Sequence, residues 1–189
     1  MLKIKTEFKL SQIKQIQETV GSKKIRSVAN KAINKTVDKA QRFIAKEIIN
    51  KQGLAVSQAA VSRSQDKKKS TVKSLGAVVI IRKKNRIPLK EFGARQNASG
   101  VSYKIRKQSG RKLIPGGFIV KSYGKNVYRR PTKLRPTGSR KYGPSIWGFF
   151  LGQKLTSPVK KYIRTQLQKE IVRELREIHI KKLKKSGTI

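Results

Sequence analysis

Cationic side chains are the residues of this sequence best placed to do chemistry. The chain has 189 residues, with 48 Lys and Arg against 9 Asp and Glu, and its formal net charge is +39. Lys and Arg bind phosphates and carboxylates, and Arg does so through a planar fork of donors. Because so large an excess repels itself, we expect the protein to work against an anionic partner: nucleic acid, an acidic protein surface or a membrane surface.

The excess charge is concentrated in the middle of the chain. Residues 67–169 contain 28 basic residues and one acidic residue, and no acid occurs between Glu91 and Glu170. Local salt bridges therefore cannot neutralise this stretch. The residues that we expect to contact DNA or an acidic partner all lie in it: Arg82, Lys83, Lys84, Arg86, Arg95, Arg106, Lys107, Arg111, Lys112, Arg129, Arg130, Arg135, Arg140 and Lys141.

The chain lacks the residues that several classes of protein require. The chain has no cysteine and a single histidine, His179, which excludes disulfide scaffolds, zinc sites of the CxxC type and thiol catalysis. Its few carboxylates are scattered, and it has neither a GxSxG nor a phosphate-loop sequence, so we expect no enzyme, no cofactor and no metal. Its longest apolar run, residues 75–81, is far below the ~18–20 residues that span a bilayer, so we expect a protein made in the cytoplasm that does not enter membranes.

Two long helices are predicted near the ends of the chain. Apolar residues recur every three or four positions over residues 22–52, between a capping Ser22 and a terminating Gly53. A second helix is expected over residues 156–185, beginning at a Thr-Ser-Pro start signal. Its three acids lie among Arg and Lys residues, which predicts an amphipathic helix with many salt bridges. A shorter helix is expected around residues 11–19.

The middle of the chain has the pattern of strands. Residues 75–82 are β-branched and apolar, as in a buried central strand, and further strands are expected at 100–107, 117–122 and 126–130. Residues 62–70 and the Pro- and Gly-rich residues 131–145 are expected to be basic loops. We therefore predict one α+β domain over residues 1–189, in which a β-meander at 72–130 forms a central antiparallel sheet flanked by the two long helices.

Two segments each allow two interpretations. Residues 53–65 resemble a helix-turn-helix, but the spacing after Gly53 is about two residues too long, so a short helix that begins at Ser57 and buries Ala60 and Val61 is favoured. The aromatic segment 146–151 either fills the core or contacts another subunit. The residues expected at such a subunit contact are Trp147, Phe149 and Phe150.

A set of motifs in the middle of the chain resembles a known family. The matching residues are Ile87-Pro88-Leu89, Phe92-Gly93-Ala94-Arg95-Gln96, Gly100-Val101, Pro115-Gly116, Phe118, Arg129-Arg130 and Tyr142-Gly143-Pro144-Ser145. In this order they resemble the minor tail protein Z family of tailed bacteriophages and prophages, the tail completion proteins. The resemblance covers residues 25–150 and is strongest over 86–145. Residues 121–125 and the Lys-rich C-terminal helix depart from the family pattern.

The resemblance implies a non-enzymatic structural protein of the virion. Such a protein sits at the head-proximal end of the tail, at the head–tail junction, and forms part of an oligomeric ring, expected to be a hexamer, around the channel that holds double-stranded DNA. Its expected partners are tail terminator or tail tube proteins, head–tail connector proteins and packaged DNA. The alternative is a free nucleic-acid-binding protein of ribosomal or nucleoid type, which the composition alone would favour.

Overall fold

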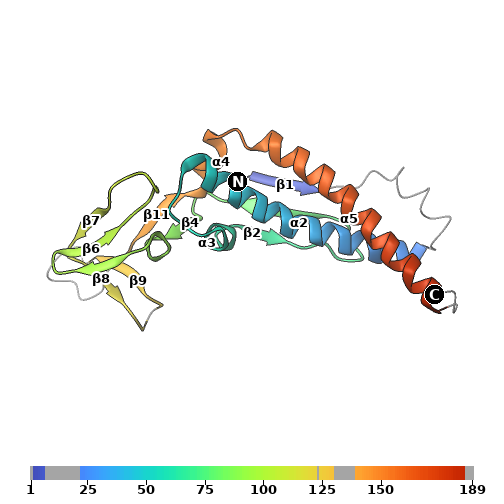
Figure 1. Ribbon diagram of the computed structural model, residues 1–189, viewed down its shortest axis with the longest axis horizontal. Coiled ribbons are helices and arrows are strands. Elements are labelled where there is room, and N and C mark those ends of the chain that lie inside the picture. The colour runs from blue at the N-terminus through green and yellow to red at the C-terminus, as the bar shows by residue number, and fades with distance from the viewer. Residues whose placement is uncertain (1, 7–21, 123, 130–138, 186–189) are drawn as a thin grey trace. The chain divides into compact units, whose positions relative to one another are not determined.

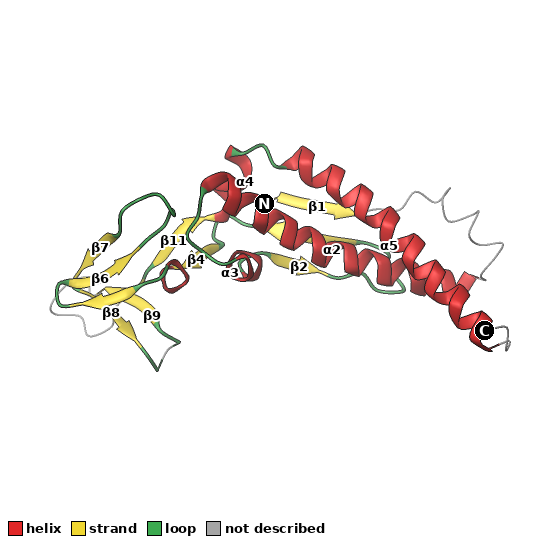
Figure 2. Cartoon of the chain, in the orientation of Figure 1, coloured by secondary structure: helices red, strands yellow, loops and turns green. Residues whose placement is uncertain are grey.

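The computed structural model describes residues 2–6, 22–122, 124–129 and 139–185, and it combines helices with small antiparallel sheets (Figures 1 and 2). The expected α+β class is therefore confirmed. The chain forms two compact units, residues 1–43, 66–80 and 156–189 in the first and residues 44–65 and 81–155 in the second. The strands are divided among four sheets of two or three strands, where we expected one domain with one central sheet. Among the described helices, none is long and apolar enough to cross a membrane.

Two long antiparallel helices, seen side by side in Figure 1, form the frame of the first unit. They are α2 (Ser22–Gln52), of which the part up to Phe43 belongs to this unit, and α5 (Thr156–Lys185), and both have the bounds that the sequence predicts. Phe43 of α2 stacks on Tyr162 of α5 with ring centroids 4.0 Å apart. The buried apolar stripes of the pair are Ile25, Val28, Ala29, Ala32, Ile33, Val37, Ala40, Val159, Ile163 and Leu167.

Two glutamates of α5 are buried rather than exposed. Glu170 and Glu174 are 2% and 4% exposed, and each accepts a hydrogen bond of 2.5 Å from a lysine of α2, Lys39 and Lys35 respectively. The hydrogen bond to Glu174 raises the pKa of Lys35. On the surface of α5, Arg173 and Glu177 form a salt bridge at 3.3 Å, as expected. The apolar periodicity of α5 did not predict this burial, because the two carboxylates lie beside the apolar stripe and their counterions come from α2.

The sheet of the first unit has the order β1-β3-β2. Its central strand β3 (Ala77–Ile81) buries alternate side chains, which confirms the central strand predicted over residues 75–82. The strand β2 (Asp66–Lys68) pairs with β3 where the sequence predicted an exposed loop over 62–70, and its three residues are indeed exposed. The strand β1 (Leu2–Thr6) was not predicted from sequence, and the helix expected around residues 11–19 lies outside the described residues.

Polar side chains of α2 hold the β2–β3 hairpin. The Asn34 amide donates to the Ser70 carbonyl at 3.1 Å, and its oxygen accepts from the Ser70 N–H at 2.8 Å. One turn further along the helix, Asp38 accepts from Lys67 at 2.6 Å and lies 3.6 Å from Lys69. Burial raises the pKa of Asp38, but the hydrogen bond from Lys67 and the charges of both lysines together lower it below its usual value.

The second unit begins with the end of α2 and a short helix. Gly53 ends α2 with a φ of +58°, and the Leu54 N–H bonds to the Ile49 carbonyl at 3.1 Å, as in a Schellman motif. The helix α3 (Gln58–Arg63) follows, capped by Ser57, whose hydroxyl accepts from the Ala60 N–H at 3.2 Å. Ala60 and Val61 are buried, so the short-helix interpretation of this segment is confirmed.

The strands of the second unit form three small antiparallel sheets, drawn as yellow arrows in Figure 2. Gln96 links two of them, because its amide donates to the carbonyls of Gly100 and Gly117 while its oxygen accepts from the Ile119 N–H at 2.9 Å. The sheets are β4 (Arg86–Pro88) with β11 (Tyr142–Ser145), β5 (Arg95–Asn97) with β6 (Gly100–Tyr103) and β7 (Lys112–Pro115), and β8 (Gly117–Val120) with β9 (Asn126–Arg129) and β10 (Ser139–Arg140).

Part of the expected basic loop over 131–145 is ordered as strands. Residues 131–138 lie outside the described residues, but β10 and β11 occupy most of 139–145. Pro144 lacks an N–H, and the register of β11 against β4 shifts between Tyr142 and Ser145, where that proline lies. The composition pointed to a loop because it does not show that an edge strand with a bulge can accept the proline.

Two motif glycines are fixed by close contacts. At Gly143, an added Cβ would lie 2.4 Å from Cε2 of Phe92, whose ring is 1% exposed. Gly100 has a φ of +141°, and a Cβ there would lie 2.1 Å from the Ile114 carbonyl oxygen. The η1 turn (Leu89–Phe92) therefore packs its phenylalanine directly onto the backbone of β11.

Replacing Gly143 with Ala should lower the free energy of unfolding by about 1–3 kcal/mol, because the new methyl group overpacks the buried Phe92 ring. Gly148→Ala is the matched control. Gly148 lies in the helix α4 (Ile146–Gly152), no atom lies within 4 Å of its added Cβ, and alanine should leave stability unchanged or raise it. Urea denaturation followed by circular dichroism measures both variants, and equal effects would contradict the packing argument.

The Asp38→Asn variant should lose stability at neutral pH and show a weaker dependence on acid. The pKa of Asp38 is lower in the folded than in the unfolded protein, where it is about 3.9. Its stabilisation is therefore complete above that value and disappears as the pH falls through the folded pKa. Thermal unfolding between pH 7 and pH 2 should show this loss in the parent protein and a smaller one in the variant. Glu177→Gln, which removes an exposed pair, should follow the parent curve closely.

Candidate nucleic-acid interface

The second unit is strongly cationic and almost free of acids. Its residues 44–65 and 81–155 include 23 Lys and Arg but only two acids, Glu47 and Glu91. Glu91 accepts a hydrogen bond of 3.2 Å from Arg63, so one of the two carboxylates already has a counterion. Most of the positive charge on this unit is therefore not neutralised by carboxylates of the unit itself.

The turn between β3 and β4 presents one group of the predicted contact residues. Its backbone is fixed at both ends, because the Asn85 N–H bonds to the Arg82 carbonyl at 3.0 Å and the Ser145 hydroxyl donates to the Lys83 carbonyl at 2.9 Å. Lys83, Lys84 and Arg86 are exposed there, whereas Arg82 is half-buried. A rigid turn that carries adjacent exposed cations suits contact with a phosphate backbone.

A second group lies on the sheet β10-β9-β8. Arg129 pairs with Ser139 and Arg140 pairs with Tyr128, so the two arginines point to opposite faces of the sheet. The Arg140 guanidinium lies 5.0 Å from the centroid of the Tyr142 ring, and Tyr128 stacks on Phe118 at 5.9 Å. Cations beside aromatic rings are frequent where proteins bind nucleic acids. Lys141, between β10 and β11 in the chain, is half-buried. Arg130 and Arg135 lie outside the described residues.

The sheet β5-β6-β7 contributes Arg95 and Lys112, both exposed, but Arg111 beside them is occupied by the protein itself. Its guanidinium donates to the carbonyls of Gly93 and Ser102 at 2.6 and 2.9 Å and to the Ser102 hydroxyl at 3.2 Å. Arg111 therefore ties β7 to β6 and to the end of η1. Charge alone could not separate this structural arginine from its neighbours, since only the fold brings the Gly93 and Ser102 carbonyls to one guanidinium.

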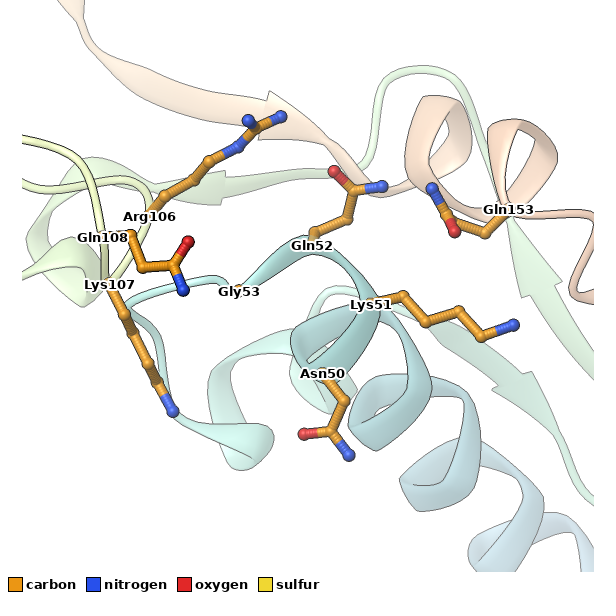
Figure 3. Close-up of a pocket in the computed structure, with 8 residues that line it drawn as sticks. All are labelled: Asn50, Lys51, Gln52, Gly53, Arg106, Lys107, Gln108 and Gln153. Carbon is orange, nitrogen blue, oxygen red and sulfur yellow. The ribbon is translucent and has the colours of Figure 1, made fainter.

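A polar cavity of about 550 Å³ lies at the end of α2 (Figure 3). Three cations line it, Lys51 at the end of the helix and Arg106 and Lys107 after β6. Its other lining side chains are amides, those of Asn50, Gln52, Gln108 and Gln153. Arg106 and Lys107 were predicted from sequence as contact residues, but Lys51 and the amides were not, because no local pattern marks residues that only folding brings together.

The predicted subunit contact is divided by the helix α4. Phe150 is fully buried, so its assignment to a subunit contact is wrong: the ring fills the core of the second unit. Trp147 and Phe149 are half-buried, and the neighbouring Leu151 is 46% exposed. Ile146 and Phe150 anchor the helix. Trp147 and Leu151, four residues apart on one side of α4, remain available to a partner, whereas Phe149 lies on the other side of the helix.

Arg111→Gln should destabilise the protein by about 1–2 kcal/mol, because it removes hydrogen bonds to two carbonyls without changing the fold's apolar core. Arg95→Gln removes the same charge from an exposed position on the same sheet and should change stability by less than about 0.5 kcal/mol. Chemical denaturation of both variants measures the difference. A larger loss for Arg95→Gln would show that Arg111 is not the structural residue.

Comparisons with known proteins give no relative: no family model, no curated protein and no solved structure matches this chain. The candidate interface therefore rests on the positions, exposure and contacts of the residues described above, and the resemblance to the tail completion proteins stays a prediction.

Proposed function

We propose that this protein is a non-enzymatic structural protein of a phage virion, a tail completion or minor tail protein at the head–tail junction. In this role it forms part of a basic ring around the DNA channel. The motifs over residues 86–145 suggest the family. The observation that carries the proposal is the composition of the second unit. It contains 23 basic residues and only two acidic ones, and one of these acids, Glu91, is already paired with Arg63.

The placement of the cations favours contact along a DNA backbone over reading of its bases. They come from a turn, from five strands (β4, β5, β7, β9 and β10) and from the end of a helix, so they form a dispersed surface. The short helix α3 does not suit a recognition helix, since it has six residues and its single cation, Arg63, is paired with Glu91. A dispersed cationic surface binds duplex DNA irrespective of sequence and with strong salt dependence.

A ring also requires contacts between subunits and with acidic neighbours. A ring about 40 Å tall encloses duplex DNA with about 24 phosphates, far fewer than the charges that six chains of +39 would bring. Most of the cations would then face acidic neighbouring proteins, and Trp147 with Leu151, on one side of α4, offers an apolar contact between copies. The hexameric number comes from the resemblance alone.

Sedimentation and negative-stain imaging test the proposal. The protein should form rings with duplex DNA or with the tails of its phage, and Leu151→Gln should weaken this assembly because it places an amide in the apolar contact. Because Leu151 is exposed, the thermal unfolding midpoint of the Leu151→Gln variant should stay close to that of the parent protein. Val72→Gln, another exposed apolar residue but in the first unit, is the control that should leave assembly unchanged.

The opposite result would favour the alternative class. A monomer that binds one RNA or DNA structure in a saturable and selective way, and forms no ring with either DNA or tails, would contradict the proposal. Selectivity must be measured as a ratio to non-specific binding at a stated salt concentration, because any chain of +39 binds nucleic acid at low salt.

A further inference from the structure

The cavity at the end of α2 is built on a rigid backbone. Residues Leu54 and Arg106 form an antiparallel bridge, in which the Lys107 N–H donates to the Gly53 carbonyl at 2.7 Å and the Ala55 N–H to the Ile105 carbonyl at 2.8 Å. Leu54 itself is fully buried, which anchors the bridge in the core. The backbone on either side of this bridge, from which the lining side chains extend, is therefore fixed.

The lining of the cavity has the chemistry of an anion site. It contains three cations and four side-chain amides, and no acidic or apolar side chain. Figure 3 shows Arg106, Gln52 and Gln153 extending on one side of the chain at Gly53, while Lys107 and Asn50 extend on the other. Within the described ranges of the chain, none of the seven polar lining side chains makes a hydrogen bond or an ion pair with the protein. By contrast, the guanidinium of Arg111 donates hydrogen bonds to two backbone carbonyls of the protein.

We infer that this cavity binds a phosphate ester: Arg106 and the amides of Gln52 and Gln153, which extend on the same side, contact the phosphate, and Lys51 and Lys107 add positive charge at its margins. The volume of 550 Å³ suits a nucleotide-sized ligand, since small-molecule sites span about 300–1,000 Å³. A drug-like apolar ligand does not fit a lining made only of cations and amides. A bidentate arginine and point-charged lysines are the groups that proteins use for phosphate.

The source of the phosphate is taken from the proposed function, on which this part of the inference rests. A DNA strand would place one nucleotide in the cavity, whereas a free nucleotide would fill it alone. Both present the same phosphate ester chemistry. The experiment therefore uses three probes: inorganic phosphate, a nucleoside monophosphate and a short DNA duplex.

Binding is measured by titration calorimetry together with the NMR shifts of the Gly53 and Lys107 amides, which lie in the cavity wall. Gln52→Ala with Gln153→Ala keeps every charge of the protein, and it should weaken the nucleotide and the duplex about tenfold by removing hydrogen bonds to a charged ligand. Arg106→Gln with Lys107→Gln should also lower the salt dependence of duplex binding, by about two in the logarithmic slope. Lys46→Gln with Lys121→Gln removes two exposed charges of the same unit outside the cavity and should change nucleotide affinity less than twofold.

The results separate this inference from the proposed function. Shifts at Gly53 and Lys107 with both the nucleotide and the duplex support the site and its nucleic-acid source. Shifts with phosphate or the nucleotide but not with the duplex support the phosphate site and assign it to a free ligand. The site would be overturned, and the DNA-binding surface left intact, by duplex binding that shifts neither amide and that the double variant Gln52→Ala with Gln153→Ala does not weaken.

Discussion

Repulsion between like charges is the constraint on which this structure depends. With nine acids among 189 residues of net charge +39, the fold has few carboxylates to place. In the described residues they lie mainly at joints between elements: Glu170 and Glu174 join α5 to α2, Asp38 joins α2 to the β2–β3 hairpin, and Glu91 meets Arg63 of α3. Each ion pair holds two elements that would otherwise present cations to each other.

Where acids are missing, amides and a guanidinium take over the linking role. Asn34 binds the backbone of Ser70 in the first unit, and Gln96 joins two small sheets of the second. Arg111 binds carbonyl groups and so contributes to stability a charge that would otherwise only repel its neighbours. Neutral partners suit this chain, because a backbone carbonyl satisfies a cation without drawing on the scarce carboxylates.

Much of the fold could be predicted from local patterns, and the exceptions have definite causes. Both long helices have their predicted bounds, since their apolar periodicity and their end signals agree. The strands β2 and β11 were expected as loops because exposed lysines and a proline mask strand character, and pairing with β3 and β4 decides them instead. Phe150 and Trp147 lie three residues apart and looked equivalent, yet only Phe150 turns into the core.

The two long helices, the α+β class and the excess of cations in the middle of the chain can be predicted from sequence, because they follow from composition and from spacing within short segments. Which charged groups bond within the protein and which remain on its surface depends on how the chain folds. Glu170, Glu174 and Arg111 became structural through partners far along the chain. Lys51 and Arg106 came together at one cavity in the same way. Hydrogen bonds and ion pairs between distant residues depend on distances that folding sets, and no local pattern contains them.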